Sequence, residues 1–178
     1  LLVRGLLYFA QESADGYAKA LREFEAATQT AWGQAEDDSG QEILYHFLGG
    51  AHLQQLIFAV QENASIDERR EIIFNGLDGY EKALDLNGDY LRAVNGEAAG
   101  YVQLARLAQV EAGNTCGWDW GWLDEATPLY QQVLDADASL KQPGDDADLN
   151  AHLGLGRIAF TRSVLPPGRR MGDRPQPL

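Results

Sequence analysis

Few residues in this chain of 178 have a type and spacing that could support catalysis. The single cysteine, Cys116, has no Lys, Arg or His beside it in the sequence to stabilise a thiolate, so it is a weak nucleophile. One cysteine alone can form neither an internal disulfide nor a cysteine zinc site. Cys116 therefore indicates neither a catalytic nor a redox function.

The histidines and acidic runs do not form a metal-binding pattern either. His46 and His52 are six residues apart and share a helix face poorly, and no HExxH motif is present. The runs at 36–38 and 145–148 lack the ligand spacing of a calcium loop, so we interpret them as solvated loops. Gly154-x-Gly156 follows no predicted strand and is not a nucleotide fingerprint. We expect no cofactor and no metal, and a stand-alone enzyme is the least favoured function.

The formal net charge of −13 is unevenly distributed. Residues 162–178 contain four arginines and one aspartate, a net +3, so the preceding 161 residues carry −16. Such a body repels phosphate backbones, and we expect no nucleic-acid binding. The acidity is interpreted either as a solubilising surface or as attraction for a basic partner.

No uninterrupted run of about 18 apolar residues occurs, so no membrane span is expected. The opening Leu-Leu-Val-Arg has neither a Met nor a signal-peptide pattern, which is typical of a fragment or a processed chain. The sequence does not assign a compartment, and a soluble, cytoplasmic chain is slightly favoured.

The elements that would position any site are predicted to be helices. The first 127 residues contain no proline, long stretches are rich in Ala, Leu, Glu and Gln, and strand-like alternation of β-branched residues is absent. Ser65 and Glu68 form a capping box, Asp15-Gly16 separates the first two helices, and Pro128 is expected near the first turn of the sixth. We predict an all-α domain at 1–164 and a Pro/Arg-rich tail without a core at 165–178. Its seven expected helices span about 1–12, 17–32, 41–62, 66–86, 89–112, 123–136 and 148–164.

An internal repeat connects these helices. Three of them carry an aromatic residue followed three positions later by a small or branched one, at Phe24, Tyr80 and Tyr130. The aromatics are 56 and 50 residues apart. Alternate helices carry Gly or Ala mid-helix, as in Leu48-Gly49-x-x-His52, Ala98-x-x-Tyr101 and Leu153-Gly154. Gly there costs up to about 1 kcal/mol of helix propensity, which is tolerated where helices cross closely.

These motifs resemble the tetratricopeptide repeat (TPR) family, most closely from Tyr80 to Tyr90, and the resemblance covers about residues 1–164. It implies an antiparallel helix-hairpin array, a TPR-like α-solenoid. The chain departs from the family in its period, about 50 residues instead of roughly 34, and in Gly88, which replaces the family's turn proline. Another α-solenoid or a helical bundle is the alternative fold.

The resemblance also implies binding residues, because the first helix of each family pair lines a groove. It points to His46, Leu53, Arg92, Asn95 and Val102. Arg92 and Asn95 are of a type that grips an extended peptide backbone or a carboxylate, although the family's carboxylate clamp uses several such residues. A partner helix in an apolar groove and simple intramolecular packing are the other interpretations.

Three tryptophans within five residues, Trp118, Trp120 and Trp122, could form a binding hot spot if exposed. Alternatively, they cover the core at the end of a helix pair.

The functional prediction is therefore a protein–protein interaction scaffold whose partner is a protein or peptide, and a basic segment and a helix are the two candidate partners. The alternative is a structural or regulatory segment of a larger multidomain protein. The apolar ends, Leu1-Leu2-Val3 and the unpaired seventh helix, predict self-association or the loss of flanking repeats.

Overall fold

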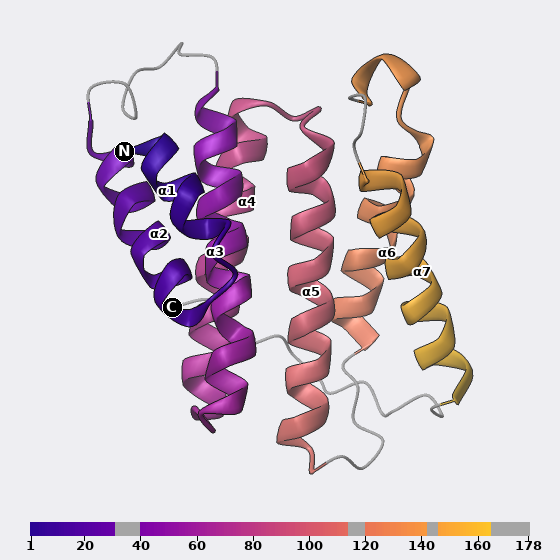
Figure 1. Cartoon of the computed structure of the whole chain (residues 1–178). Helices are drawn as coiled ribbons and strands as arrows, with labels where there is room; N and C mark the ends of the chain where they lie inside the picture. The colour runs from indigo at the N-terminus through magenta and orange to yellow at the C-terminus, as the bar shows by residue number, and fades with distance from the viewer. Residues whose placement is uncertain (31–39, 114–119, 142–145, 165–178) are drawn as a thin grey trace.

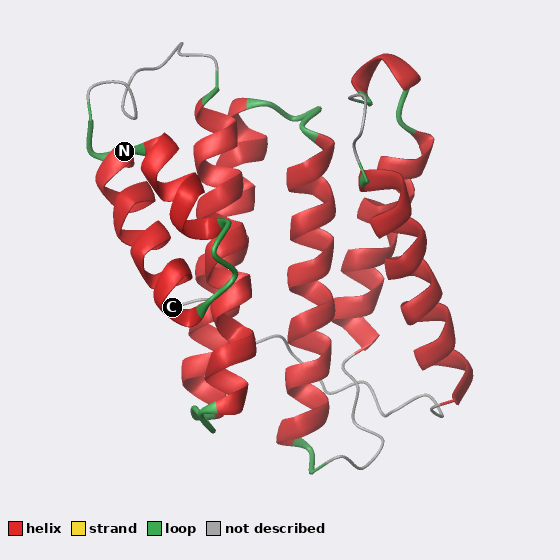
Figure 2. Cartoon of the chain, viewed as in Figure 1, coloured by secondary structure: helices red, strands yellow, loops and turns green. Residues whose placement is uncertain are grey.

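The computed structural model describes residues 1–30, 40–113, 120–141 and 146–164. Within these residues the chain is all-helical and contains no strand, which confirms the all-α part of the prediction (Figures 1 and 2). Seven α-helices and one short 3-10 helix occur: α1 Leu2–Phe9, α2 Ala14–Thr28, α3 Gln41–Gln61, α4 Ile66–Leu86, α5 Leu91–Glu111, α6 Trp120–Asp135, η1 Ala138–Leu140 and α7 Ala147–Val164.

Two helix starts differ from the sequence prediction by three residues each. Helix α2 begins three residues earlier than expected, because the Ser13 hydroxyl accepts a hydrogen bond from the Gly16 N–H at 3.0 Å. Asp15 therefore lies in the first turn of α2, where a negative charge is favourable, and Asp15-Gly16 does not separate two helices. Helix α6 begins at Trp120, which places Pro128 inside the helix instead of near its first turn.

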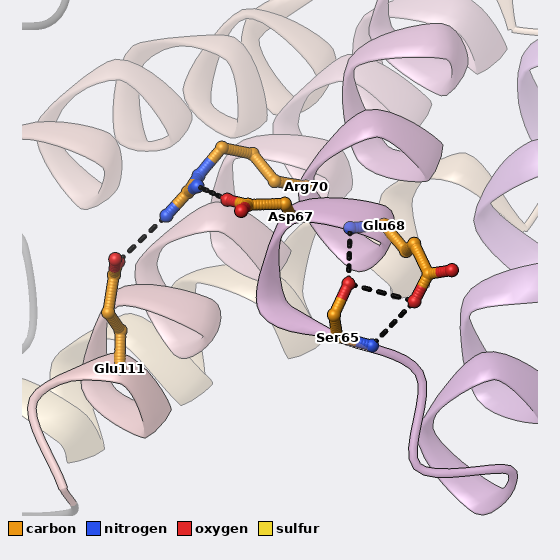
Figure 3. Close-up of polar contacts among 5 residues, drawn as sticks. All are labelled: Ser65, Asp67, Glu68, Arg70 and Glu111. Atoms are coloured by element: carbon orange, nitrogen blue, oxygen red, sulfur yellow. Dashed lines mark hydrogen bonds and ion pairs between the residues drawn. The ribbon is translucent and has the colours of Figure 1, made fainter.

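The predicted capping box is present at the start of α4 (Figure 3). The Ser65 hydroxyl accepts from the Glu68 N–H, and the Glu68 carboxylate accepts from the Ser65 N–H at 2.7 Å. One turn on, Arg70 pairs with Asp67 at 2.6 Å and with Glu111 at 2.8 Å (Figure 3). Arg70 thereby ties the beginning of α4 to the end of α5.

The helices pack in chain order, each against the next, from α1 and α2 at one side to α7 at the other (Figure 1). Odd-numbered helices also contact one another, in the pairs α1 with α3, α3 with α5 and α5 with α7. The buried side chains form four clusters that follow this order. The arrangement aligns the four odd-numbered helices along one side of the row.

Glycines and aromatic rings set the distances between helices. A Cβ atom on Gly79 of α4 would lie 2.6 Å from the Gly49 nitrogen of α3, so these two backbones are in direct contact. Each repeat aromatic covers one glycine at a distance that leaves no room for a Cβ. Phe24 lies over Gly5, Tyr80 over Gly96 and Tyr130 over Gly154, with the added Cβ at 2.4, 2.3 and 2.3 Å from the ring.

Helix α3 is, by length and composition, able to cross a membrane, and it is the one such helix in the part that the structure describes. Its most apolar window reaches a mean hydropathy of 1.2, although this helix contains no uninterrupted apolar run long enough to span a membrane. Mostly buried core helices pass the same test, and 28% of this window is buried in the fold. In this fold α3 packs against α2, α4 and α5.

Candidate functional site

A groove of about 610 Å³ lies among the described residues, and we call it the odd-helix groove. All four odd-numbered helices contribute to its wall, together with Tyr130 of α6. The lining residues are Phe9, His46, Phe47, Arg92, Asn95, Gly96, Ala99, Tyr130, Asp146, Ala147, Asn150, Leu153, Gly154 and Arg157. It brings together His46, Arg92 and Asn95, three of the five residues to which the repeat pattern points.

His46 is held in place by three aromatic rings. Its imidazole lies 5.1 Å from the ring of Phe47, 5.6 Å from that of Tyr80 and 5.4 Å from that of Tyr90, measured between ring centroids. These rings come from α3, from α4 and from the residue before α5. His46 is therefore a half-buried part of the groove wall whose orientation is fixed by packing.

Two guanidinium groups give the groove a positive character. Arg92 comes from α5 and Arg157 from α7, and one acidic residue, Asp146, lies among the lining residues. Burial raises the pKa of Tyr130 to about 12, while the charge of Arg157 acts in the opposite direction, which places this guanidinium near the phenol. A positive groove in a strongly acidic chain favours a ligand segment that carries negative or hydrogen-bond-accepting groups.

Amide groups add directional hydrogen bonding. The Asn95 side-chain oxygen is buried and has no hydrogen-bond partner in the structure. A buried acceptor without a partner costs about 1–3 kcal/mol, which a ligand N–H could recover. Asn150 of α7 contributes a second, exposed amide to the same wall.

Leu53 and Val102 do not line this groove. Leu53 packs between α3 and α4, where its side chain would lie 2.9 Å from a Cβ added to Gly76. Val102 is buried in the cluster shared by α5, α6 and α7, and it lines a smaller cavity of about 330 Å³ on that side. The other lining residues of this smaller cavity are Arg106, Leu123, Arg157, Ile158, Phe160 and Thr161.

Trp120 and Trp122 lie against the helices instead of forming one exposed patch. The Trp122 ring stacks on Tyr101 of α5, with ring centroids 5.7 Å apart and planes 15° apart. The Arg162 guanidinium of α7 lies 5.8 Å from the Trp120 ring centroid. Both indoles are half-buried, so they cover the α5–α7 core. Trp118 lies outside the described residues.

No match to this chain is found among protein-family models, curated proteins or solved structures. The candidate site therefore depends on geometry alone. Among the described residues, no group of three His, Cys, Asp or Glu side chains could hold a metal ion.

Sequence reasoning missed Asn150 and Arg157, although a signal for them was available. A repeat aromatic ring contacts Gly96 of α5 and another contacts Gly154 of α7 in the same way. When these two glycines are aligned, each residue of α7 corresponds to the residue of α5 that lies 58 positions earlier in the sequence. Under this offset Arg92 corresponds to Asn150. The residue was missed because the seventh helix was treated as unpaired and not aligned with the fifth.

Proposed function

We propose that this chain is a protein-interaction scaffold, a TPR-like helical array whose odd-helix groove binds an extended segment of another protein. One observation carries the proposal: four odd-numbered helices contribute polar and aromatic side chains to a single groove of about 610 Å³. A volume of this size is typical of ligand sites, which occupy about 300–1,000 Å³.

The composition of the groove suits a peptide backbone. Arg92 and Arg157 can pair with a carboxylate or donate to backbone carbonyls, and the two asparagine amides can both donate and accept. Phe9, Phe47 and Leu153 supply apolar surface for alternate side chains of an extended segment. The buried, unpartnered oxygen of Asn95 favours a ligand that brings an N–H group.

The TPR-like interpretation is supported by the repeated seating of an aromatic ring on a glycine. Tyr80 on Gly96 and Tyr130 on Gly154 both join an even-numbered helix to the next odd-numbered helix. Phe24 differs, because it lies over Gly5 of the helix that precedes it. The repeat is therefore regular from α4 to α7, and the first pair of helices is the exception.

Selection of displayed random peptides on the intact protein tests this function. We expect enriched sequences whose binding is lost with Asn95→Leu, a substitution for which α7 offers a precedent because Leu153 holds the equivalent position. Arg106→Gln, at an exposed position of α5 outside the groove, is the control and should leave binding intact. Failure to enrich any peptide, or enriched peptides that bind the Asn95→Leu protein equally well, would refute the groove as the binding site.

A further inference from the structure

Asn-Gly pairs occur three times in the chain, at 75–76, 87–88 and 95–96. An asparagine followed by glycine can lose its side-chain amide without an enzyme, because glycine has no Cβ to hinder the attack of its nitrogen on that amide. The sequence alone makes the three pairs equivalent. The structure distinguishes them, since two lie inside helices and one lies in an exposed turn.

The first and third pairs are held inside α4 and α5. The helical hydrogen-bond pattern pairs the N–H of each of these glycines with the carbonyl oxygen four residues earlier. Both glycines are also crowded, because an added Cβ would lie 2.9 Å from Leu53 at Gly76 and 2.3 Å from Tyr80 at Gly96. Turning either glycine nitrogen onto the neighbouring side chain would therefore break the helix.

The second pair, Asn87-Gly88, lies in the turn between α4 and α5, and both residues are exposed. A Cβ added to Gly88 would meet the Leu84 carbonyl oxygen at 3.8 Å, and among the described residues the Gly88 N–H has no hydrogen bond. Two hydrogen bonds hold Asn87: the Tyr90 N–H donates to its carbonyl at 3.0 Å, and the Asp89 N–H donates to its side-chain oxygen at 3.2 Å. Exposed turn bonds open more readily than those of a helix interior.

We propose that Asn87 is a site of spontaneous covalent modification, which deamidates in the folded protein far faster than Asn75 and Asn95. The Gly88 nitrogen loses its proton to a solvent base and attacks the Cγ of Asn87. The Cγ–Nδ2 bond breaks, and the amide nitrogen takes up a proton and leaves as ammonia, which closes a five-membered succinimide ring. Water then adds to either ring carbonyl and leaves aspartate or isoaspartate at position 87.

Both products change the connection between α4 and α5. Each adds a negative charge shortly before the first turn of α5, where the helix dipole favours it. Isoaspartate also routes the main chain through the former side chain, which inserts one additional carbon atom ahead of Tyr90. The ring of Tyr90 lies 5.4 Å from that of His46, so the inserted atom lies close to the packing that orients this imidazole.

Peptide mapping of the intact protein after incubation at mildly alkaline pH tests this site. Trypsin, which cleaves after Lys and Arg, places the three pairs in separate peptides, 71–82, 83–92 and 93–106. Mass spectrometry follows the conversion of amide to carboxyl in each peptide, and electron-transfer fragmentation recognises isoaspartate. We expect peptide 83–92 to convert at least about tenfold faster than the other two. Asn75 is the matched comparison, because it is exposed like Asn87 and differs in its helical backbone.

Two controls show whether the fold selects Asn87. In guanidinium chloride the three peptides should convert at similar rates, because no helix then protects two of them. Gly88→Ala should slow conversion at Asn87 about tenfold through hindrance by the added methyl group, and Gly88 is not in the left-handed region, so alanine fits its backbone.

Equal conversion of the three peptides in the folded protein overturns the assignment. So does conversion at Asn87 that occurs only after unfolding, or that Gly88→Ala leaves unchanged. Asn95→Leu should not alter the rate at Asn87, so this site and the odd-helix groove can fail separately.

Discussion

The contact between α3 and α4 and the contact of α7 with its neighbours use similar residues with different results. At the first, Gly49 and Gly79 bring two backbones into direct contact, and no space remains for a methyl group. At the second, Gly154 receives a ring in the same way, yet cavities of about 610 and 330 Å³ lie along α7. The difference indicates that the contact between α3 and α4 leaves less unfilled space than the contacts of α7 with its neighbours.

The largest effect that would test this comparison comes from removing the equivalent rings. We expect Tyr80→Ala to lower the free energy of unfolding by about 4 kcal/mol and Tyr130→Ala by about 2 kcal/mol. Tyr80 is enclosed by Gly49 and Gly96 and by the ring of His46, whereas α7 can move into the space that Tyr130 leaves. Denaturant unfolding of the two variants measures the difference. Equal losses would show that α7 is packed as rigidly as the centre.

Glycine substitutions sharpen the comparison, because they should change stability in opposite directions. A Cβ at Gly79 would lie 2.6 Å from the nitrogen and 2.7 Å from the Cα of Gly49, so Gly79→Ala must separate the helices. We expect a loss of about 3 kcal/mol. At Gly156 the added methyl meets nothing within 4 Å, and Gly156→Ala should gain about 0.5–1 kcal/mol through helix propensity.

The measurement is again denaturant unfolding, with midpoints compared at constant slope. A stabilised Gly79→Ala protein would show that the α3–α4 contact is looser than the distances indicate. A destabilised Gly156→Ala protein would show that another group lies closer to Gly156 than the structure indicates.

Much of the fold could be predicted from the sequence, because local signals mark most helix ends. Ser65 with Glu68 set the start of α4, and proline-free stretches of good helix formers indicated the long helices. The start of α2 was misplaced because Ser13 and Asp15-Gly16 fit both a helix end and a helix beginning. The start of α6 was misplaced because Pro128 was taken for a first-turn residue, although prolines are tolerated inside some helices.

The candidate site was less predictable, since it depends on which face of each helix meets a neighbour. Arg92 and Asn95 were found because the resemblance to the TPR family points to groove positions on the fifth helix. Leu53 and Val102 have the same helical spacing, but they face α4 and α6. Sequence periodicity gives the separation between residues on one face, and the crossing of the helices decides what that face contacts.

A smaller effect on stability is expected from two glutamates, one in the interior and one at the periphery, whose pKa values shift in opposite directions. Burial raises the pKa of Glu97 on α5, and the nearby charges of Glu81 and Glu125 act in the same direction, although a hydrogen bond from the Tyr101 hydroxyl opposes them. At the exposed start of α4, hydrogen bonds from Ser65 lower the pKa of Glu68. The two carboxyl groups should therefore give stability opposite dependences on pH.

Because the folded state raises the pKa of Glu97, its contribution to stability is complete below the unfolded pKa of about 4.3 and is lost as pH rises through the folded value. Glu97→Gln should thus slightly stabilise the protein at pH 7, and the gain should disappear near pH 4. Glu68→Gln should instead slightly destabilise the protein at pH 7, and this loss should disappear on acidification. The reason is that the stabilisation by Glu68 is present above pH 4.3 and is lost as pH falls through the lowered folded pKa. Thermal unfolding of Glu97→Gln between pH 4 and 7, and of Glu68→Gln on acidification from pH 7 to well below pH 4, measures the two slopes. Parallel slopes would mean that Glu97 is as well solvated as Glu68, and that the α5 interior is open to water.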